Sequence, residues 1–229
     1  MPKVIKKKIA KPAKTEEGVQ NVIHDAREYM QEKKRVLFPA VIAVIIVCLG
    51  AAGFSLYRSN MQKEASALEH EGYKLYYELY QKQPLAKDEL YQKALDKFTK
   101  AYDKRRSPLS LFYIASCYYD LGKYDDAMRS LKELNERFPD DETFAPLSFY
   151  KMAVIDLKKG DKEAALKQLD ALYNYRAGSF KDLALVESAR ILEAMGKKDE
   201  SVKKYEELTK NFPDSPFAPL AKAKLQEKS

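Results

Sequence analysis

Histidine and cysteine, two residue types that often do chemistry, are scarce in this sequence of 229 residues, with two of each. His70 stands between Glu69 and Glu71, but neighbouring residues on a helix point in different directions, so these side chains do not predict a cluster. Cys117 lies in the apolar run LFYIASCYY, and we interpret it as a small buried hydrophobe rather than a reactive thiol. With no nucleotide-binding loop and no metal-ligand spacing, we expect no catalytic site, no cofactor and no metal.

Tyrosine is the residue type whose distribution suggests a function. Ten of the sixteen tyrosines lie between Tyr73 and Tyr124. Aromatic side chains with a polar tip suit the binding of peptides or unfolded segments of other proteins. The alternative, which the sequence leaves open, is that these rings only pack the interior of a small helical domain.

The elements that carry these tyrosines are predicted to be paired helices. Gly is scarce, Trp is absent, and Ala, Leu, Lys and Glu are abundant, which is a helical composition. The clearest unit is LSLFYIASCYYDLGKYDDAMRSLKELNERFPDD, residues 109–141. In it, Ala115 and Ala127 are small residues that permit close contact between two helices, and Pro139 ends the second helix.

Similar units recur along the chain. Their second helices share a small residue at Ala94, Ala127, Ala165 and Ser201, at steps of 33, 38 and 36 residues. We therefore predict four hairpins, over residues 60–103, 108–139, 145–175 and 181–213, followed by a capping helix over 216–229. In the first hairpin, the first helix is expected to run from about Asn60 to Gln81.

The spacing of Leu111, Ile114, Ala115 and Tyr118 resembles the tetratricopeptide repeat, although Asp156 replaces the expected tyrosine in the third unit. The resemblance implies an all-α solenoid in which the first helix of each repeat lines a concave groove. It places ten residues in that groove: Tyr73, Tyr76, Tyr77, Phe112, Ser116, Tyr119, Tyr150, Val154, Val186 and Arg190. The basic residues that clamp a C-terminal carboxylate in chaperone-binding relatives are not evident there, so carboxylate capture is not expected.

Upstream of the repeats, residues 36–57 read VLFPAVIAVIIVCLGAAGFSLY and carry no charge. As a helix, these residues would extend roughly 33 Å, enough for a hydrocarbon core of about 30 Å. We predict one transmembrane helix here, in contact with the lipid bilayer. A cleaved signal peptide is the alternative, but the apolar run and the residues before it are longer than in such peptides.

The charge distribution predicts the orientation. Residues 1–35 hold ten Lys/Arg against five Asp/Glu, and Lys33, Lys34 and Arg35 adjoin the span. The positive-inside rule then places this basic tail, with an amphipathic helix over 15–35, in the cytoplasm, and residues 58–229 across the membrane. Of the net charge of +7, only +2 remains for residues 36–229. We therefore expect no nucleic-acid partner and no small-molecule substrate.

This layout resembles the bacterial inner-membrane family that includes the ancillary tetratricopeptide subunit of the Sec translocon. The segment NFPDSPFAPLAKAKL, residues 211–225, is also similar to repeats of periplasmic proteins that coordinate envelope assembly and Tol–Pal function. The resemblance implies a periplasmic chaperone or scaffold at a translocon, which binds exposed segments or translocon subunits. One alternative is an envelope-assembly or cell-division scaffold without chaperone activity. Another is an import receptor of the mitochondrial outer membrane.

Overall fold

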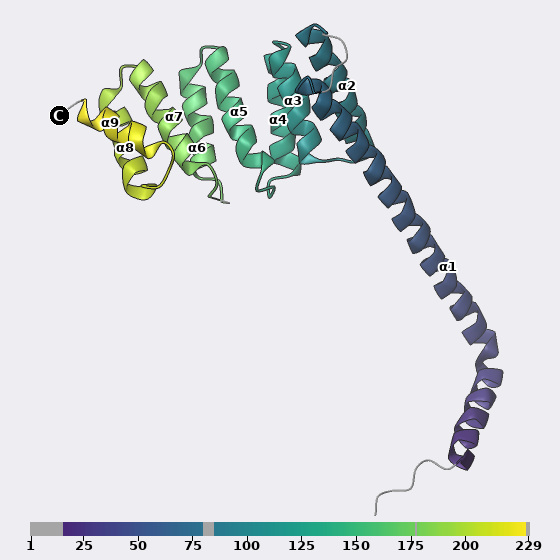
Figure 1. Cartoon of the computed structure of the whole chain (residues 1–229). Coiled ribbons are helices and arrows are strands. Elements are labelled where there is room, and N and C mark those ends of the chain that lie inside the picture. The colour runs from purple at the N-terminus through teal and green to yellow at the C-terminus, as the bar shows by residue number, and fades with distance from the viewer. Residues whose placement is uncertain (1–15, 80–84, 177, 228–229) are drawn as a thin grey trace, which may run out of the picture. The chain divides into compact units, whose positions relative to one another are not determined.

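The structure, a computed structural model, describes residues 16–79, 85–176 and 178–227, which form nine α-helices (Figure 1). Residues 1–15, at the start of the basic tail, lie outside the described residues. The chain divides into two compact units, Met1–Ser59 and Asn60–Ser229, and helix α1 (Glu16–Tyr76) contributes to both. Eight further helices complete the second unit: α2 (Lys87–Lys104), α3 (Pro108–Asp120), α4 (Tyr124–Arg137), α5 (Phe144–Lys158), α6 (Lys162–Tyr173), α7 (Lys181–Ala194), α8 (Lys198–Asn211) and α9 (Ala218–Gln226).

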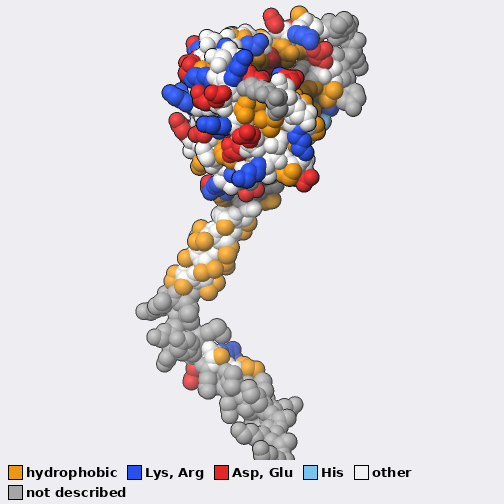
Figure 2. All heavy atoms as spheres, turned by 90° about the vertical axis from the view of Figure 1, so that its left-hand side faces the viewer, with side chains coloured by type: hydrophobic (Ala, Val, Ile, Leu, Met, Phe, Trp, Pro, Cys, Tyr) orange, Lys and Arg blue, Asp and Glu red, His pale blue; other side chains and the backbone are white. Residues whose placement is uncertain are grey.

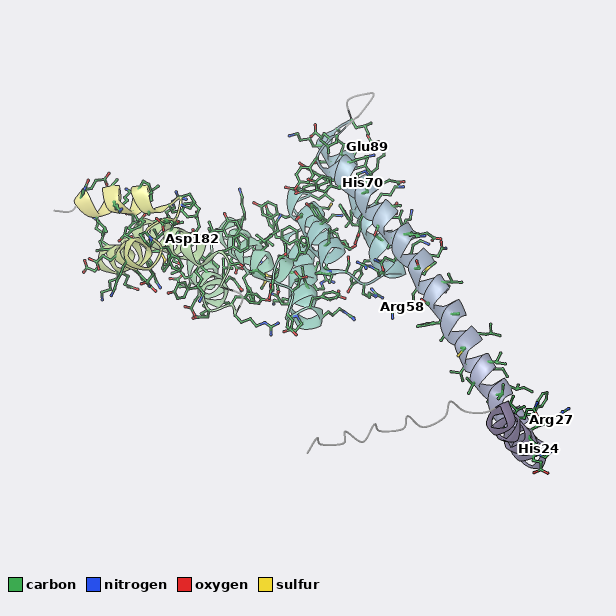
Figure 3. All side chains as sticks on the ribbon, turned by 60° about the horizontal axis from the view of Figure 1, so that its bottom comes forward. His24, Arg27, Arg58, His70, Glu89 and Asp182 are labelled. Atoms are coloured by element: carbon green, nitrogen blue, oxygen red, sulfur yellow. The ribbon has the colours of Figure 1, made fainter. Side chains whose placement is uncertain are left out.

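Among the described residues, α1 is the one helix long and apolar enough to cross a membrane. Its part from Phe38 to Tyr76 contains a window with a mean hydropathy of 2.4, none of which is buried. Hydrophobic side chains cover much of the face of the apolar part of α1 that is visible in Figure 2. Arg58, labelled in Figure 3, follows the last residue of the predicted span.

The second unit is an all-α solenoid of helical hairpins, as predicted. Three sets of residues on the second helices of the four hairpins fill its core. The small residues are Ala94, Ala127, Ala165 and Ser201; four residues later stand Phe98, Leu131, Leu169 and Tyr205; three residues after those stand Ala101, Leu134, Leu172 and Leu208. All twelve are at most 1 % exposed. The helices therefore meet along one repeated stripe of small and large side chains.

The first helix of each hairpin ends in the same way. At the end of α3, the Gly122 amide donates to the Tyr119 carbonyl and the Lys123 amide to the Tyr118 carbonyl. This is the Schellman arrangement, which requires a left-handed residue, and Gly122 has φ of 72°. Helices α5 and α7 end in the same pattern at Gly160 and Gly196.

Helix α1 ends in this arrangement too, but earlier than the predicted Gln81. The Glu78 amide donates to the Leu75 carbonyl and the Leu79 amide to the Lys74 carbonyl. Glu78 takes the left-handed conformation, with φ of 55°, at the position that glycine occupies in the other three hairpins. A side chain makes this conformation costly, so a glycine is the usual sign of such a helix end. Because Glu78 stands there instead, the end of the helix at Tyr76 could not be predicted from the sequence.

Helix α1 contacts α2 closely at Gly72. A Cβ atom added to this glycine would lie 3.0 Å from two atoms of the Phe98 ring, which is itself fully buried. Two ion pairs flank the contact: Glu71 with Lys97 at 2.6 Å, and Glu64 with Lys104. The last turns of α1 are thus part of the first hairpin.

Replacing Gly72 by Leu is expected to lower the free energy of unfolding of the second unit by about 1–3 kcal/mol, because the new side chain overpacks against Phe98. The measurement is urea unfolding of the full chain in neutral detergent, followed by tyrosine near-ultraviolet circular dichroism. Ala67→Leu is the matched control, since Ala67 is exposed on the same helix, and its effect should stay within about 0.5 kcal/mol. Equal stability of the two variants would contradict close packing of α1 on α2.

The third hairpin contains a buried carboxyl group. Asp156 stands where the repeat pattern has a tyrosine, is 9 % exposed, and its Oδ2 atom has no hydrogen-bond partner among the described residues. Burial, assisted by the charge of Asp161, raises the pKa of Asp156 above its ordinary value. The ionised form is thus less favourable in the folded than in the unfolded chain.

This burial predicts a pH dependence of stability. Because the folded-state pKa of Asp156 is raised, its protonated form stabilises the fold at low pH, and this contribution is lost as pH rises through that pKa. Asp156→Asn should therefore unfold at higher urea concentration than the wild type at pH 7, and the difference should shrink toward pH 4. A difference that is constant with pH would show that Asp156 ionises freely in the fold.

Candidate protein-binding surface

Five tyrosines, from the end of α1 and the turn after it, from α2 and from α3, gather on the first hairpin and the start of the second. We call Tyr73, Tyr76, Tyr77, Tyr91 and Tyr113 the tyrosine surface. Ring centroids lie 4.5 Å apart for Tyr73 and Tyr77, and 5.8 Å apart for Tyr73 and Tyr113. Tyr76 joins the group through Tyr77 at 4.9 Å, Tyr91 at 5.6 Å and Tyr113 at 5.6 Å. Most of these contacts are edge-to-face, the arrangement that aromatic quadrupoles favour.

Contacts with residues of other helices fix two of these rings, Tyr113 and Tyr76. Tyr113 stacks on the buried ring of Phe98, with centroids 4.9 Å apart and planes 12° apart. The Tyr76 hydroxyl donates to Oδ2 of Asp120 at 2.5 Å. Burial, and this bond to a carboxylate, raise the pKa of Tyr76, so the hydroxyl stays a donor. Both rings form a rigid base for the surface.

The other rings reach solvent. Tyr73 is 40 % exposed and Tyr77 is 47 % exposed, which is high for a large hydrophobic side chain. The hydroxyls of Tyr77 and Tyr113 lie 3.4 Å apart. A partner at this surface would meet open ring area and phenol hydroxyls that can donate or accept hydrogen bonds.

A lysine lies on a second group of rings, from α3. The Lys151 ammonium of α5 lies 5.4 Å from the ring centre of Phe112 and 5.2 Å from that of Tyr119, and donates to the Ser116 hydroxyl at 2.8 Å. Burial lowers the pKa of Lys151, and the charge of Asp120 acts in the opposite direction. Because an ammonium has three donors, this group retains capacity to bind a carbonyl or a carboxylate.

The remaining predicted groove residues lie on α5 and α7. Tyr150 and Val154 are half-buried, and Arg190 is exposed. The Arg190 guanidinium donates to Glu187 at 2.7 Å, so its charge is already paired. Burial, and then the charge of Glu187, raise the pKa of Tyr150, which places this ring near the Glu187–Arg190 pair.

The structure corrects two of the ten predicted groove residues. Val186 is fully buried, because it packs in a core cluster with Ala218 and Ala221 of α9. Ser116 is 1 % exposed, and its hydroxyl donates to the Phe112 carbonyl of its own helix. Neither side chain is open to a partner, although Ser116 positions Lys151.

Four residues in or beside these groups of rings were not among the ten predicted groove residues: Tyr91, Tyr113, Asp120 and Lys151. A signal existed for two of them, because Tyr113 and Asp120 share one helix face with Ser116 at steps of three and four residues. Tyr91 and Lys151 gave no such signal, since their roles depend on contacts between helices.

The described residues hold no group of three or more His, Cys, Asp or Glu side chains that could bind a metal. His70 is exposed on α1 (Figure 3). Cys117 is fully buried, and burial raises the pKa of its thiol to about 12, so the thiol is unreactive at neutral pH.

With this geometry established, comparison with known proteins places the chain in a family. The model of the tetratricopeptide repeat-like domain matches residues 27–228. The chain belongs to this family.

Comparison with solved structures gives matches of low similarity. A crystal structure of MamA shares 16 % sequence identity, covers 75 % of this chain and 85 % of that one, and has a TM-score of 0.46. The complex of the TPR2AB domain of yeast Sti1 with pHSP90 shares 20 % identity, covers 71 % of each chain, and has a TM-score of 0.43. No curated protein matches the sequence significantly.

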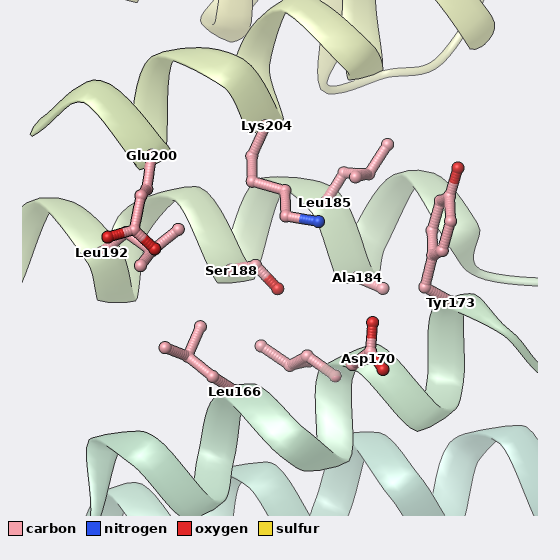
Figure 4. Close-up of a pocket in the computed structure, with 10 residues that line it drawn as sticks. Leu166, Asp170, Tyr173, Ala184, Leu185, Ser188, Leu192, Glu200 and Lys204 are labelled. Carbon is pink, nitrogen blue, oxygen red and sulfur yellow. The ribbon is translucent and has the colours of Figure 1, made fainter. Parts of the chain in front are cut away.

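The tetratricopeptide fold is a scaffold for protein interactions. A separate cavity of about 190 Å³ lies between α6, α7 and α8 (Figure 4). The repeat position held by Tyr118 in α3 is held in α7 by Leu192, which lines this cavity. A leucine fills less space than a tyrosine. Ser188 also lines the cavity, and Arg190, two residues on, points away from it. The cavity is thus separate from the Arg190 side of α7. Because its rings are open to solvent, the tyrosine surface is the better candidate for binding other proteins.

Proposed function

We propose that this protein is a membrane-anchored interaction module that binds exposed segments of other proteins at the tyrosine surface. The observation that carries the proposal is the open ring area of Tyr73 and Tyr77, supported by two rings that the core holds fixed. Tyrosine supplies large contact area at a low cost in side-chain entropy, and a preorganised surface loses little freedom on binding.

Polar groups beside the rings suit a segment without secondary structure. The backbone of such a segment has carbonyl groups that need donors. The hydroxyls of Tyr77 and Tyr113 share one hydrogen bond with each other, which leaves one of them as a donor, and the ammonium of Lys151 supplies others. The rings would contact side chains of the bound segment, and the donors would contact its backbone. Such a surface would bind segments of many sequences, each weakly.

The anchor compensates for weak binding. We infer that residues 36–57 span the inner membrane of a bacterium, with the basic tail in the cytoplasm and the repeats in the periplasm. This orientation is supported by Lys33, Lys34 and Arg35 before the apolar stretch. Tethering raises the effective concentration of the surface for clients that emerge nearby, without any new contact. A chaperone or scaffold at a protein translocon is the role that this arrangement fits best.

The experiment measures binding of an unfolded probe protein to the full chain in nanodiscs of phosphatidylcholine. The probe is reduced and carboxymethylated α-lactalbumin, and native α-lactalbumin is its folded counterpart. We expect the unfolded form to bind and the native form not to bind. Tyr73→Ala/Tyr77→Ala should weaken binding about thirtyfold, because each tyrosine that a partner buries contributes about 1 kcal/mol as an anchor.

Lys203→Ala/Lys210→Ala on α8 is the matched control, since both lysines are exposed and distant in sequence from the tyrosine surface. It should bind the unfolded probe as the wild type does, and circular dichroism should show all variants folded. Undiminished binding by the double tyrosine variant would contradict the proposed site. Equal binding of native and unfolded probe would favour an envelope-assembly scaffold that recognises folded partners.

A further inference from the structure

Carboxylates surround the tyrosine surface. Asp120 accepts the hydrogen bond of Tyr76 from one side. The charges of Asp120, Glu78 and Asp88 all raise the pKa of Tyr91, after the larger effect of burial. The faces of aromatic rings are themselves negative. The electrostatic potential at this surface therefore favours a positive group.

Cations near these carboxylates neutralise them only in part, and the charge of Asp120 acts on Lys151. Lys87 pairs with Glu78 at 3.9 Å, and both side chains are largely exposed, so this pair neutralises Glu78 only in part. Lys97 pairs with Glu71. Lys151 donates to the Ser116 hydroxyl rather than to Asp120.

Several cations in the described part of the chain lie over rings outside the tyrosine surface. Arg106 lies 4.4 Å from the ring centre of Tyr102, and Lys181 lies 5.3 Å from that of Tyr173. Lys151 covers Phe112 and Tyr119. This protein thus uses cation–ring contacts repeatedly within its own fold, whereas Tyr73 and Tyr77 present their rings to solvent.

We propose that the tyrosine surface selects segments that carry a basic side chain, arginine above all, which lies on the rings of Tyr73 and Tyr77 near Asp120. The guanidinium group stacks on aromatic faces, is weakly hydrated and stays charged at all relevant pH values. This inference rests on the proposed function and adds to it the chemical class of the residue that the surface prefers.

The test compares two fluorescein-labelled peptides, acetyl-Gly-Ser-Arg-Phe-Ser-Gly-amide and the same peptide with citrulline in place of arginine. Citrulline has almost the same shape but no charge. Dissociation constants are measured by fluorescence anisotropy with the full chain in phosphatidylcholine nanodiscs. The arginine peptide should bind about fivefold more tightly than the citrulline peptide.

Two variants locate the preference. Tyr73→Leu/Tyr77→Leu retains apolar contact area but removes the aromatic faces, and it should reduce the ratio of the two dissociation constants to about one. Asp120→Asn should lower the ratio in the same direction. Asp199→Asn, which removes an exposed carboxylate of α8, is the matched control and should leave the ratio unchanged.

Equal affinity of the wild type for the two peptides would overturn this inference and leave the proposed function standing, because segments would still bind. An arginine preference that persists in Tyr73→Leu/Tyr77→Leu would also overturn it, since the cation would then be recognised elsewhere. If neither peptide binds, both the inference and the proposed function fail.

Discussion

The structure depends on the packing of the last turns of α1 into the first hairpin. Gly72 lets α1 approach the ring of Phe98, and Glu69 accepts hydrogen bonds from Ser107 at 2.6 Å and Ser110 at 2.7 Å at the start of α3. The same helix carries the apolar stretch of residues 36–57. The helix proposed as the membrane anchor is therefore also the helix that supplies two rings of the tyrosine surface, Tyr73 and Tyr76.

The surface forms because the fold stacks several helices beside α1. Phe98 of α2 supports Tyr113 of α3, while Asp120 at the end of α3 holds Tyr76 of α1. Tyr76 and Tyr113 are each fixed by a residue from another helix, so the surface exists only when the first two hairpins are assembled. Rigid aromatic rings with surrounding carboxylates give this surface a chemical preference that open apolar area alone would not have.

Much of the fold could be predicted because repeat positions obey local rules. Ala127 and Leu131 follow helical periodicity, and both are fully buried as the pattern requires. The site was harder to predict, since it depends on contacts between elements. The helical position of Val186 predicts a groove residue, but Val186 packs in a core cluster with residues of α8 and α9. The end of α1 differs from the prediction because Glu78 takes a conformation that sequence patterns reserve for glycine.

The most direct test of the central claim, that α1 anchors the repeats on the side of the membrane opposite the basic tail, is cysteine labelling in intact bacterial spheroplasts. A membrane-impermeant maleimide is applied to two full-length variants, Asp214→Cys in the repeats and Lys14→Cys in the tail. Both variants also carry Cys48→Ser, because Cys48 is exposed, whereas the other native cysteine, Cys117, is buried and unreactive and adds no background. The account predicts that Asp214→Cys is labelled in intact spheroplasts and that Lys14→Cys is labelled only after lysis. Labelling of Lys14→Cys in intact spheroplasts, or release of an unanchored body that lacks residue 14, would contradict it.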